Sequence, residues 1–209
     1  DQNFGANNIW TISDRTLLES RFQYVHSRFQ SPPSDLVGPA VNISGVANFG
    51  TATFSPTGRN IDSFEIANNV THQRGSHSFK TGVDYLYDRV RIEFPGALQG
   101  VYAFANLANF LAGKYINYQQ AFGEPTTHQS NPNFGLFVSD EWHVRPNVTL
   151  NAGLRYDLQF LPSLVSIDTN NVSPRLGIAW DPGRDGKTVV RASYGLFFDR
   201  LPLRALSNA

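Results

Sequence analysis

Apolar and polar residues alternate with a period of two over unusually long segments, and this pattern constrains the fold more than any other feature. Within residues 148–158, Val, Leu, Ala and Tyr fill the even positions, while Thr, Asn, Gly, Arg and Asp fill the odd ones. Successive side chains of a β-strand point to opposite faces. The segment therefore predicts a strand with one apolar face and one polar face.

The same alternation recurs along the chain, which predicts an all-β fold. Further strands are expected at residues 18–24, 64–73, 79–89, 134–144, 175–180 and 188–199, with weaker candidates at 101–105 and 115–122. Residues 106–113 form the one expected helix, a short one. Strands of soluble sheets typically have about 5 to 6 residues, whereas about eleven cross the apolar band of an outer membrane when the strand is tilted. Strand length thus favours a membrane barrel.

The connections between these strands alternate in length. Tight turns rich in Gly, Pro, Asn and Asp are expected at residues 74–76, 145–147 and 181–187. Long polar stretches at 30–61, 91–132 and 159–172 separate them. Short connections on one side and long ones on the other are typical of membrane barrels.

The two faces of the predicted strands carry different chemistry. Charged residues among glycines and serines could not form the dry interior of a sandwich, but they could line a hydrated lumen, where Arg and Asp would pair across strands. The open alternative is the solvated face of a soluble antiparallel sheet. The lumen-facing candidates are Arg21, Lys80, Asp84, Arg155, Asp157 and Arg191. The lipid-facing and aromatic-girdle candidates are Trp142, Leu154, Tyr156, Trp180, Tyr194 and Phe198.

Composition narrows the class of protein. Seventeen basic and seventeen acidic residues cancel, so charge predicts no nucleic-acid partner. Cysteine is absent, which excludes disulfide scaffolds and thiolate metal sites. No run approaches the ~20 apolar residues of a membrane helix. The chain begins with Asp1 and contains no methionine, so we expect a matured product or an interior fragment.

No motif predicts catalysis, a metal or a cofactor. His72 and His77 flank a tight turn, but no third ligand is spaced to join them. Residues 186–188 resemble the end of a phosphate-binding loop, yet Asp181 stands where that motif needs glycine, so a hairpin turn explains them better. Asp84 and Asp88 share a face as paired carboxylates would, but lumen-facing charge is the simpler explanation for them. We expect a protein that is not an enzyme.

Three stretches resemble a known family. They are residues 134–156 (FGLFVSDEWHVRPNVTLNAGLRY), 173–200 (SPRLGIAWDPGRDGKTVVRASYGLFFDR) and 75–85 (GSHSFKTGVDY). These stretches look like barrel segments of TonB-dependent outer-membrane receptors, particularly the Oar-like group with an amino-terminal carboxypeptidase-regulatory-like domain. The resemblance implies a barrel of about twenty-two strands, plugged by an amino-terminal domain and opened by energy passed from the inner membrane through TonB.

The resemblance also implies a location and partners. The location is the outer membrane of a Gram-negative-type envelope, and the partners are outer-membrane lipid, the TonB system and a small ligand. Such families take up siderophores, cobalamin, oligosaccharides or peptides. Which residues contact the ligand stays open.

We therefore expect residues 1–209 to be part of a receptor-like barrel domain, an antiparallel wall of about eight or nine strands. No plug domain or TonB box is recognisable, and the chain ends in Leu-Ser-Asn-Ala without the terminal aromatic that closes related barrels. The leading hypothesis is a segment of an active transporter. A second is a small outer-membrane porin or structural barrel, and a third is a soluble β-sandwich that binds carbohydrate.

Overall fold

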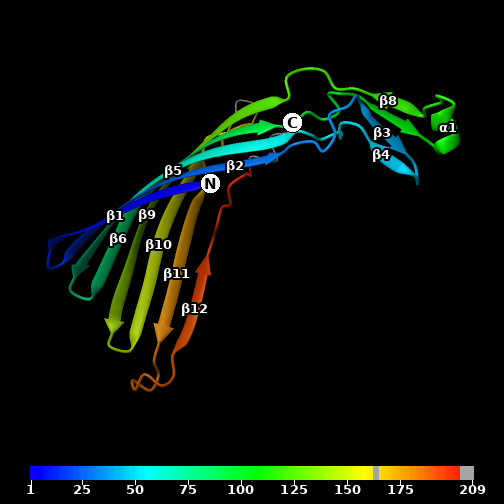
Figure 1. Ribbon diagram of the computed structural model, residues 1–209. Coiled ribbons are helices and arrows are strands. Elements are labelled where there is room, and N and C mark those ends of the chain that lie inside the picture. The colour runs from blue at the N-terminus through cyan, green and yellow to red at the C-terminus, as the bar shows by residue number, and fades with distance from the viewer. Residues whose placement is uncertain (162–164, 203–209) are drawn as a thin grey trace. The chain divides into compact units, whose positions relative to one another are not determined.

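The computed structural model describes residues 1–161 and 165–202, and nearly all regular structure in them is β-strand (Figure 1). Eight strands form one sheet in the order β1-β2-β5-β6-β9-β10-β11-β12, and the pairs from β9 to β12 are antiparallel. The sheet is open, with β1 and β12 at its edges. This confirms the predicted partial barrel wall. The strands are β1 Gln2–Ser13, β2 Thr16–Ser31, β5 Thr57–Arg74, β6 His77–Glu93, β9 Thr126–Arg145, β10 Val148–Gln159, β11 Val172–Trp180 and β12 Val190–Gly195.

Strands in this sheet are long. Strand β9 has 20 residues, and β10 has 12, whereas about 9 to 11 residues suffice to cross a bilayer when the strand is tilted. Apolar residues of one strand pair with apolar residues of the next, and most polar residues pair with polar or small ones. Leu154 lies opposite Val138 of β9, and Arg155 lies opposite Phe137 of β9 and Ser173 of β11. One face of β9 to β12 is therefore predominantly apolar, and the other is predominantly polar.

The connections alternate in length, and the tight turns predicted at 74–76, 145–147 and 181–187 are present, whereas the turn at 14–15 was not predicted. Residues 14–15, 75–76, 146–147 and 181–189 connect successive strands at one end of the sheet, while 32–56, 94–125 and 160–171 make the long connections (Figure 1). Gly75 has φ +60°, a left-handed conformation that glycine adopts without penalty. Asp181 organises the last turn, because its carboxylate accepts the backbone N–H groups of Arg184 at 2.9 Å and Gly186 at 2.8 Å. The segment that resembled a phosphate-binding loop is thus a side-chain-stabilised turn.

A second, smaller sheet has the order β4-β3-β7-β8. Its strands are β3 Ala40–Ile43, β4 Ala47–Phe49, β7 Val101–Phe104 and β8 Asn117–Gln119. The predicted helix is present as α1, Leu107–Leu111, and the side chain of Asn106 caps it by accepting the N–H of Asn109 at 2.9 Å. Phe110 of α1 packs edge-on against Phe49 and Phe104. None of the helices in the described ranges has the length and apolar character needed to span a membrane.

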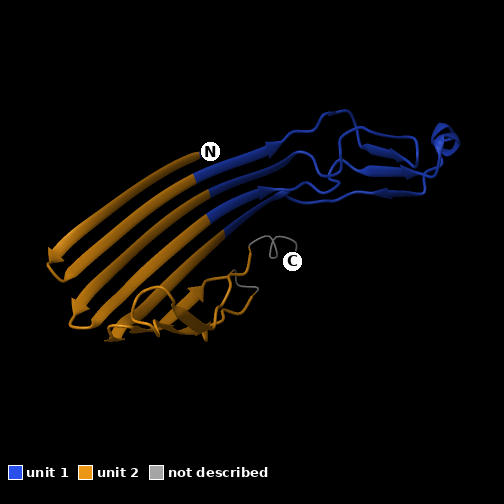
Figure 2. Cartoon of the chain, turned by 90° about the horizontal axis from the view of Figure 1, so that it is seen from below, with its two compact units in different colours: residues 1, 26–61, 89–129 blue, residues 2–25, 62–88, 130–209 orange. Residues whose placement is uncertain are grey.

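The chain divides into two compact units (Figure 2). One unit comprises residues 1, 26–61 and 89–129 and contains the small sheet; its buried core includes Ala40, Ala97 and Val101. The other comprises residues 2–25, 62–88 and 130–209 and contains β1, β10, β11 and β12 with the adjoining parts of β2, β5, β6 and β9.

Several sequence predictions need correction. The alternation did not predict β1, whose asparagines are poor strand formers. The stretch 30–61 was expected to be a polar connection, but it contains β3, β4 and the start of β5. The strand expected at 188–199 covers only 190–195. The predictions about the Leu-Ser-Asn-Ala terminus, and about residues 162–164 of the third long connection, lie outside the described residues.

Candidate functional site

A cluster of paired charges lies on the polar face, with Arg155 of β10 at its centre. The Nε and Nη2 atoms of Arg155 donate to the Asp157 carboxylate at 2.7 to 3.0 Å. Nη2 also lies 2.9 Å from Oδ1 of Asp84, which belongs to β6. A guanidinium fork that holds two carboxylates is rigid and strongly bonded. The expected cross-strand Arg–Asp pairing is therefore present between Arg155 and Asp84. With Asp157, which pairs with Arg155 along the same strand, the cluster contains three of the six lumen-facing candidates.

The Arg155–Asp84 contact crosses an entire strand, because β9 lies between β6 and β10. Gly135 of β9 makes the crossing possible. A Cβ atom at this position would lie 2.2 Å from Nη2 of Arg155 and 2.6 Å from Oδ1 of Asp84. The missing side chain thus opens the path that the guanidinium occupies. The Arg155 and Asp84 side chains are 21% and 22% exposed, so the bridge is mostly shielded from water.

The remaining lumen-facing candidates stay apart from this cluster. Nζ of Lys80 lies 3.8 Å from Oε2 of Glu19 instead. Arg191 lies opposite Ala179 in register, on the same face as Arg155, and Arg21 lies exposed in β2. Neither arginine forms a salt bridge with the described residues. The alternation of the sequence correctly predicted that Arg191 and Arg155 lie on the same face of the sheet. It could not predict which charged side chains would form salt bridges.

Five of the six lipid-facing candidates occupy the apolar face of β9 to β12. In register, Trp142 lies opposite Leu150, Leu154 opposite Val138, Tyr156 opposite Leu136, Trp180 opposite Val148 and Tyr194 opposite Leu176. The face is uncovered: Leu176 is 61% exposed and Tyr194 is 66% exposed. The sixth candidate, Phe198, follows the end of β12 and lines a cavity instead.

One polar pair interrupts the apolar face, and sequence reasoning missed it. Asp140 lies opposite Ala152, at an otherwise apolar position of β9, and its Oδ2 lies 2.7 Å from Nδ1 of His77. The His77 ring stacks on Phe79 at 5.4 Å and on Trp142 at 5.2 Å. The sequence did contain a sign of this pair, because Asp140 stands at a position of the strand where the alternation calls for an apolar residue. His72, the other histidine of the turn, contacts the Thr16 hydroxyl at 2.9 Å.

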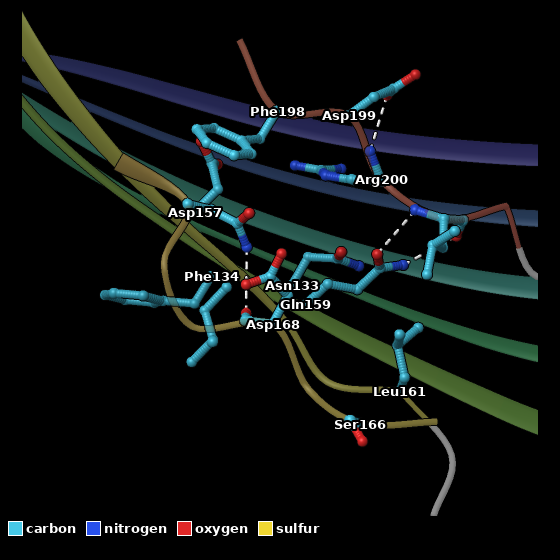
Figure 3. A pocket seen from close by; sticks show the side chains of 13 residues that line it. Asn133, Phe134, Asp157, Gln159, Leu161, Ser166, Asp168, Phe198, Asp199 and Arg200 are labelled. Carbon is cyan, nitrogen blue, oxygen red and sulfur yellow. Dashed lines mark hydrogen bonds between the residues drawn. The ribbon is translucent and has the colours of Figure 1, made fainter. Parts of the chain in front are cut away.

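A small cavity of about 140 Å³ lies beyond the charge cluster, at the end of β10 (Figure 3). Its lining comes from Asn133 and Phe134 within β9, from the end of β10, from Leu161 and residues 166–171 before β11, and from residues 198–201 after β12. Its lining includes Asn133, Asp157, Gln159, Asp168, Phe198 and Asp199. The sequence did not predict this cavity, because its lining brings together segments that lie far apart in the sequence.

Comparison with known proteins fits this geometry. A family model described as an outer membrane beta barrel domain matches residues 1–166 and 159–209, which together cover the chain. The chain belongs to this family. Its location is therefore the outer membrane, as the sequence resemblance implied.

A curated protein is similar to part of this chain. The chain is 29% identical over 157 residues to the TonB-dependent transporter Oar of Myxococcus xanthus, a match that covers 65% of this chain and 14% of that protein. The resemblance to Oar-like TonB-dependent proteins is thereby confirmed. The chain spans only a small part of this relative's length.

Solved structures share the fold of this outer-membrane barrel domain. The outer membrane transporter YddB from Escherichia coli has a TM-score of 0.61 at 16% identity, over 92% of this chain and 25% of that one. The copper transporter OprC has a TM-score of 0.56 at 18% identity, over 92% of this chain and 30% of that one. In both, the match covers a fraction of a larger protein.

Proposed function

We propose that this chain is a section of the barrel wall of a TonB-dependent transporter, which takes up a ligand actively across the outer membrane. The observation that carries the proposal is the two-faced sheet of long strands, with an exposed apolar face opposite a face of paired charges. The similarity to a TonB-dependent transporter supports it, although the match covers 14% of that relative.

In this proposal one face of the sheet contacts lipid, and the other borders the water-filled lumen. The face that carries Leu154, Leu176 and Tyr194 contacts lipid, because so large an exposed apolar surface is unfavourable in water. The face that carries Arg155 and Asp84 borders the hydrated lumen, because charged groups facing lipid near the midplane destabilise a barrel by about 2 to 4 kcal/mol. The short turns then lie on the periplasmic side, and the long connections point outward.

The outward connections and the lumen-facing side chains are the parts that would meet a ligand, since loops held on a rigid scaffold commonly carry recognition. The proposed ligand classes are siderophores, oligosaccharides and peptides. We assign the chain binding and passage, not catalysis. Energy for passage would come through a plug domain and the TonB system, which act on the protein as a whole.

Two measurements on the whole protein, purified from its host in detergent, test this function. Binding of the carboxy-terminal domain of TonB is measured by biolayer interferometry. Permeability is measured by swelling of protein-loaded liposomes in arabinose. A plugged transporter should bind TonB saturably and leave the liposomes impermeable.

The opposite pattern identifies a different function. Rapid swelling in arabinose without TonB binding would mean a porin, and active uptake would have to be abandoned. A protein that is monomeric and folded without any detergent would instead fit a soluble carbohydrate-binding sandwich. Neither result is compatible with the proposed transporter wall.

A further inference from the structure

We propose that three arginines on the lipid-facing side of the sheet bind the phosphate groups of anionic lipids in the outer leaflet of the membrane. They are Arg28 of β2 and Arg89 and Arg91 of β6, which together form the arginine patch. All three are exposed, and all lie in the compact unit that is blue in Figure 2. The inference rests on the proposed assignment of lipid and lumen faces, but not on active transport.

Alternation along β6 places two of the arginines on the apolar face. Asp84 of β6 bonds to Arg155 on the polar face, and successive strand residues point to opposite sides. Arg89 and Arg91 are odd-numbered and therefore lie on the opposite face from Asp84. Burial agrees with this assignment, because Val90, which lies between them and points to the other side, is only 6% exposed.

Contacts between strands place Arg28 on the same face. The Tyr24 hydroxyl of β2 donates to Asp62 of β5 at 3.0 Å, so the even-numbered residues of these two strands share a face. Gly58, an even-numbered residue of β5, adjoins Glu93 of β6, because a Cβ atom added to Gly58 would lie 3.7 Å from Cβ of Glu93. Strands β2, β5 and β6 are neighbours in the sheet. Arg28 therefore lies on the same face as the two arginines of β6.

The chemistry of this face changes along β6 from apolar to basic. Phe79, which follows the short turn, Val83 and Tyr85 are each 40% exposed on it, and Arg89 and Arg91 follow toward the long connection. Phe79 and Arg89 are ten residues apart, a separation that spans about 25 Å across the membrane for a strand tilted by about 40°. The apolar band of an outer-membrane barrel is also about 25 Å tall. The arginine patch therefore lies at the level where the lipid headgroups begin.

The arginine patch has no internal partner. None of its three side chains forms a salt bridge or a hydrogen bond within residues 1–161 and 165–202. Among the described strand residues of this unit that share the face, Glu93 is the one carboxylate, so the face keeps a net positive charge. A planar guanidinium group binds phosphate through two parallel hydrogen bonds. A lipid phosphate fits better than a free anion, because the acyl chains of the lipid would contact the apolar part of the same face.

The test uses the whole protein in detergent and two lipids with the same acyl chains, dioleoyl phosphatidic acid and dioleoyl phosphatidylcholine. Native mass spectrometry titrations measure the dissociation constant of the first bound lipid. We expect phosphatidic acid to bind more tightly, because phosphatidylcholine has no net charge. Arg91→Gln and Arg28→Gln should each weaken the binding of phosphatidic acid about fivefold, the typical effect of one arginine near an anionic lipid surface. Both arginines are exposed, so their replacement should leave folding intact.

Arg59→Gln is the matched control, because Arg59 is also an exposed strand arginine of this unit but, as an odd-numbered residue of β5, points to the other face. It should bind phosphatidic acid like the wild type. Equal binding of the two lipids would overturn the proposal, as would unchanged affinity in the patch variants or the same loss in Arg59→Gln. Self-association of the wild type that Arg91→Gln abolishes, without any preference for phosphatidic acid, would also overturn it and make the patch a contact between copies. TonB binding is measured without phosphatidic acid, so the lipid site and the transport function can fail separately.

Discussion

At the scale of single residues, the charge cluster shows what local pattern can predict and where it stops. Alternation placed Arg155 and Asp157 on one face and correctly suggested pairing of arginine with aspartate. It could not show that Arg155 reaches past β9 to Asp84, because that contact depends on the register of three strands. Nor could it single out Gly135, one of 17 glycines in the chain, as the position that leaves the path open.

Gly135→Ala should break the Arg155–Asp84 bridge. The added methyl group would meet the ends of two flexible side chains, so the guanidinium would move away while the strand stays in place. We expect a loss of about 1 to 3 kcal/mol, the effect of removing a hydrogen bond to a shielded charged group. Urea unfolding of the whole protein reinserted in lipid vesicles measures it. Gly177→Ala is the control, because its new Cβ would meet nothing closer than 3.6 Å. Equal losses in both variants would show that Gly135 has no special role.

The His77–Asp140 pair gives a second prediction at this scale. Asp140→Leu alone should destabilise the protein by about 1 to 3 kcal/mol, because His77 loses its partner on a largely apolar face. Combining it with His77→Phe should restore most of the stability, since replacing both partners by apolar groups can be nearly neutral. A double-mutant cycle from the same urea titrations measures the coupling. Additive losses would mean that the pair contributes nothing as a pair.

At the scale of elements, the long strands and tight turns were predictable, and the small sheet was only partly so. Long strands leave many periods of alternation. Gly-Ser marks the turn at 75–76, and Pro-Asn marks the turn at 146–147. The segment 101–105 was a weak strand candidate, but its partner β3 was missed. Strand β3 pairs in parallel with β7, joining Ala40 to Val101. Such a short strand shows little alternation, and its pairing depends on residues far away in sequence.

The faces of β10 can be tested directly. Leu154 is 48% exposed on the apolar face, and Asn151 lies three residues earlier on the polar face, opposite Gly177. Leu154→Arg should destabilise the refolded protein by about 2 to 4 kcal/mol if this part of β10 lies near the bilayer midplane. Asn151→Arg should have little effect, because its charge would enter the hydrated lumen. Refolding titrations into lipid vesicles compare the two variants. Equal tolerance of arginine at both positions would refute the assignment of lipid and lumen faces.

At the scale of the whole molecule, the sheet combines an uncovered apolar face with two unpaired edges, β1 and β12. An exposed edge presents free N–H and C=O groups that can pair with another chain. Detergent covers an apolar face but cannot satisfy these backbone groups. The 209-residue chain alone should therefore aggregate in water and remain oligomeric in detergent.

The free edge of β12 suggests how to test this expectation. The Leu196 N–H donates to the Pro174 carbonyl, so by alternation the N–H of Tyr194 points toward β11 and that of Ser193 points away. Ser193→Pro removes an outward donor without breaking the pairing of β12 with β11, because edge strands tolerate proline at such positions. Sedimentation velocity in detergent should show smaller oligomers of Ser193→Pro than of the wild type. Ala192→Pro is the control, because it removes an inward donor and should disrupt β12 itself. If wild type and Ser193→Pro sediment alike, association through the β12 edge is ruled out, and the oligomers must form through β1 or the apolar face.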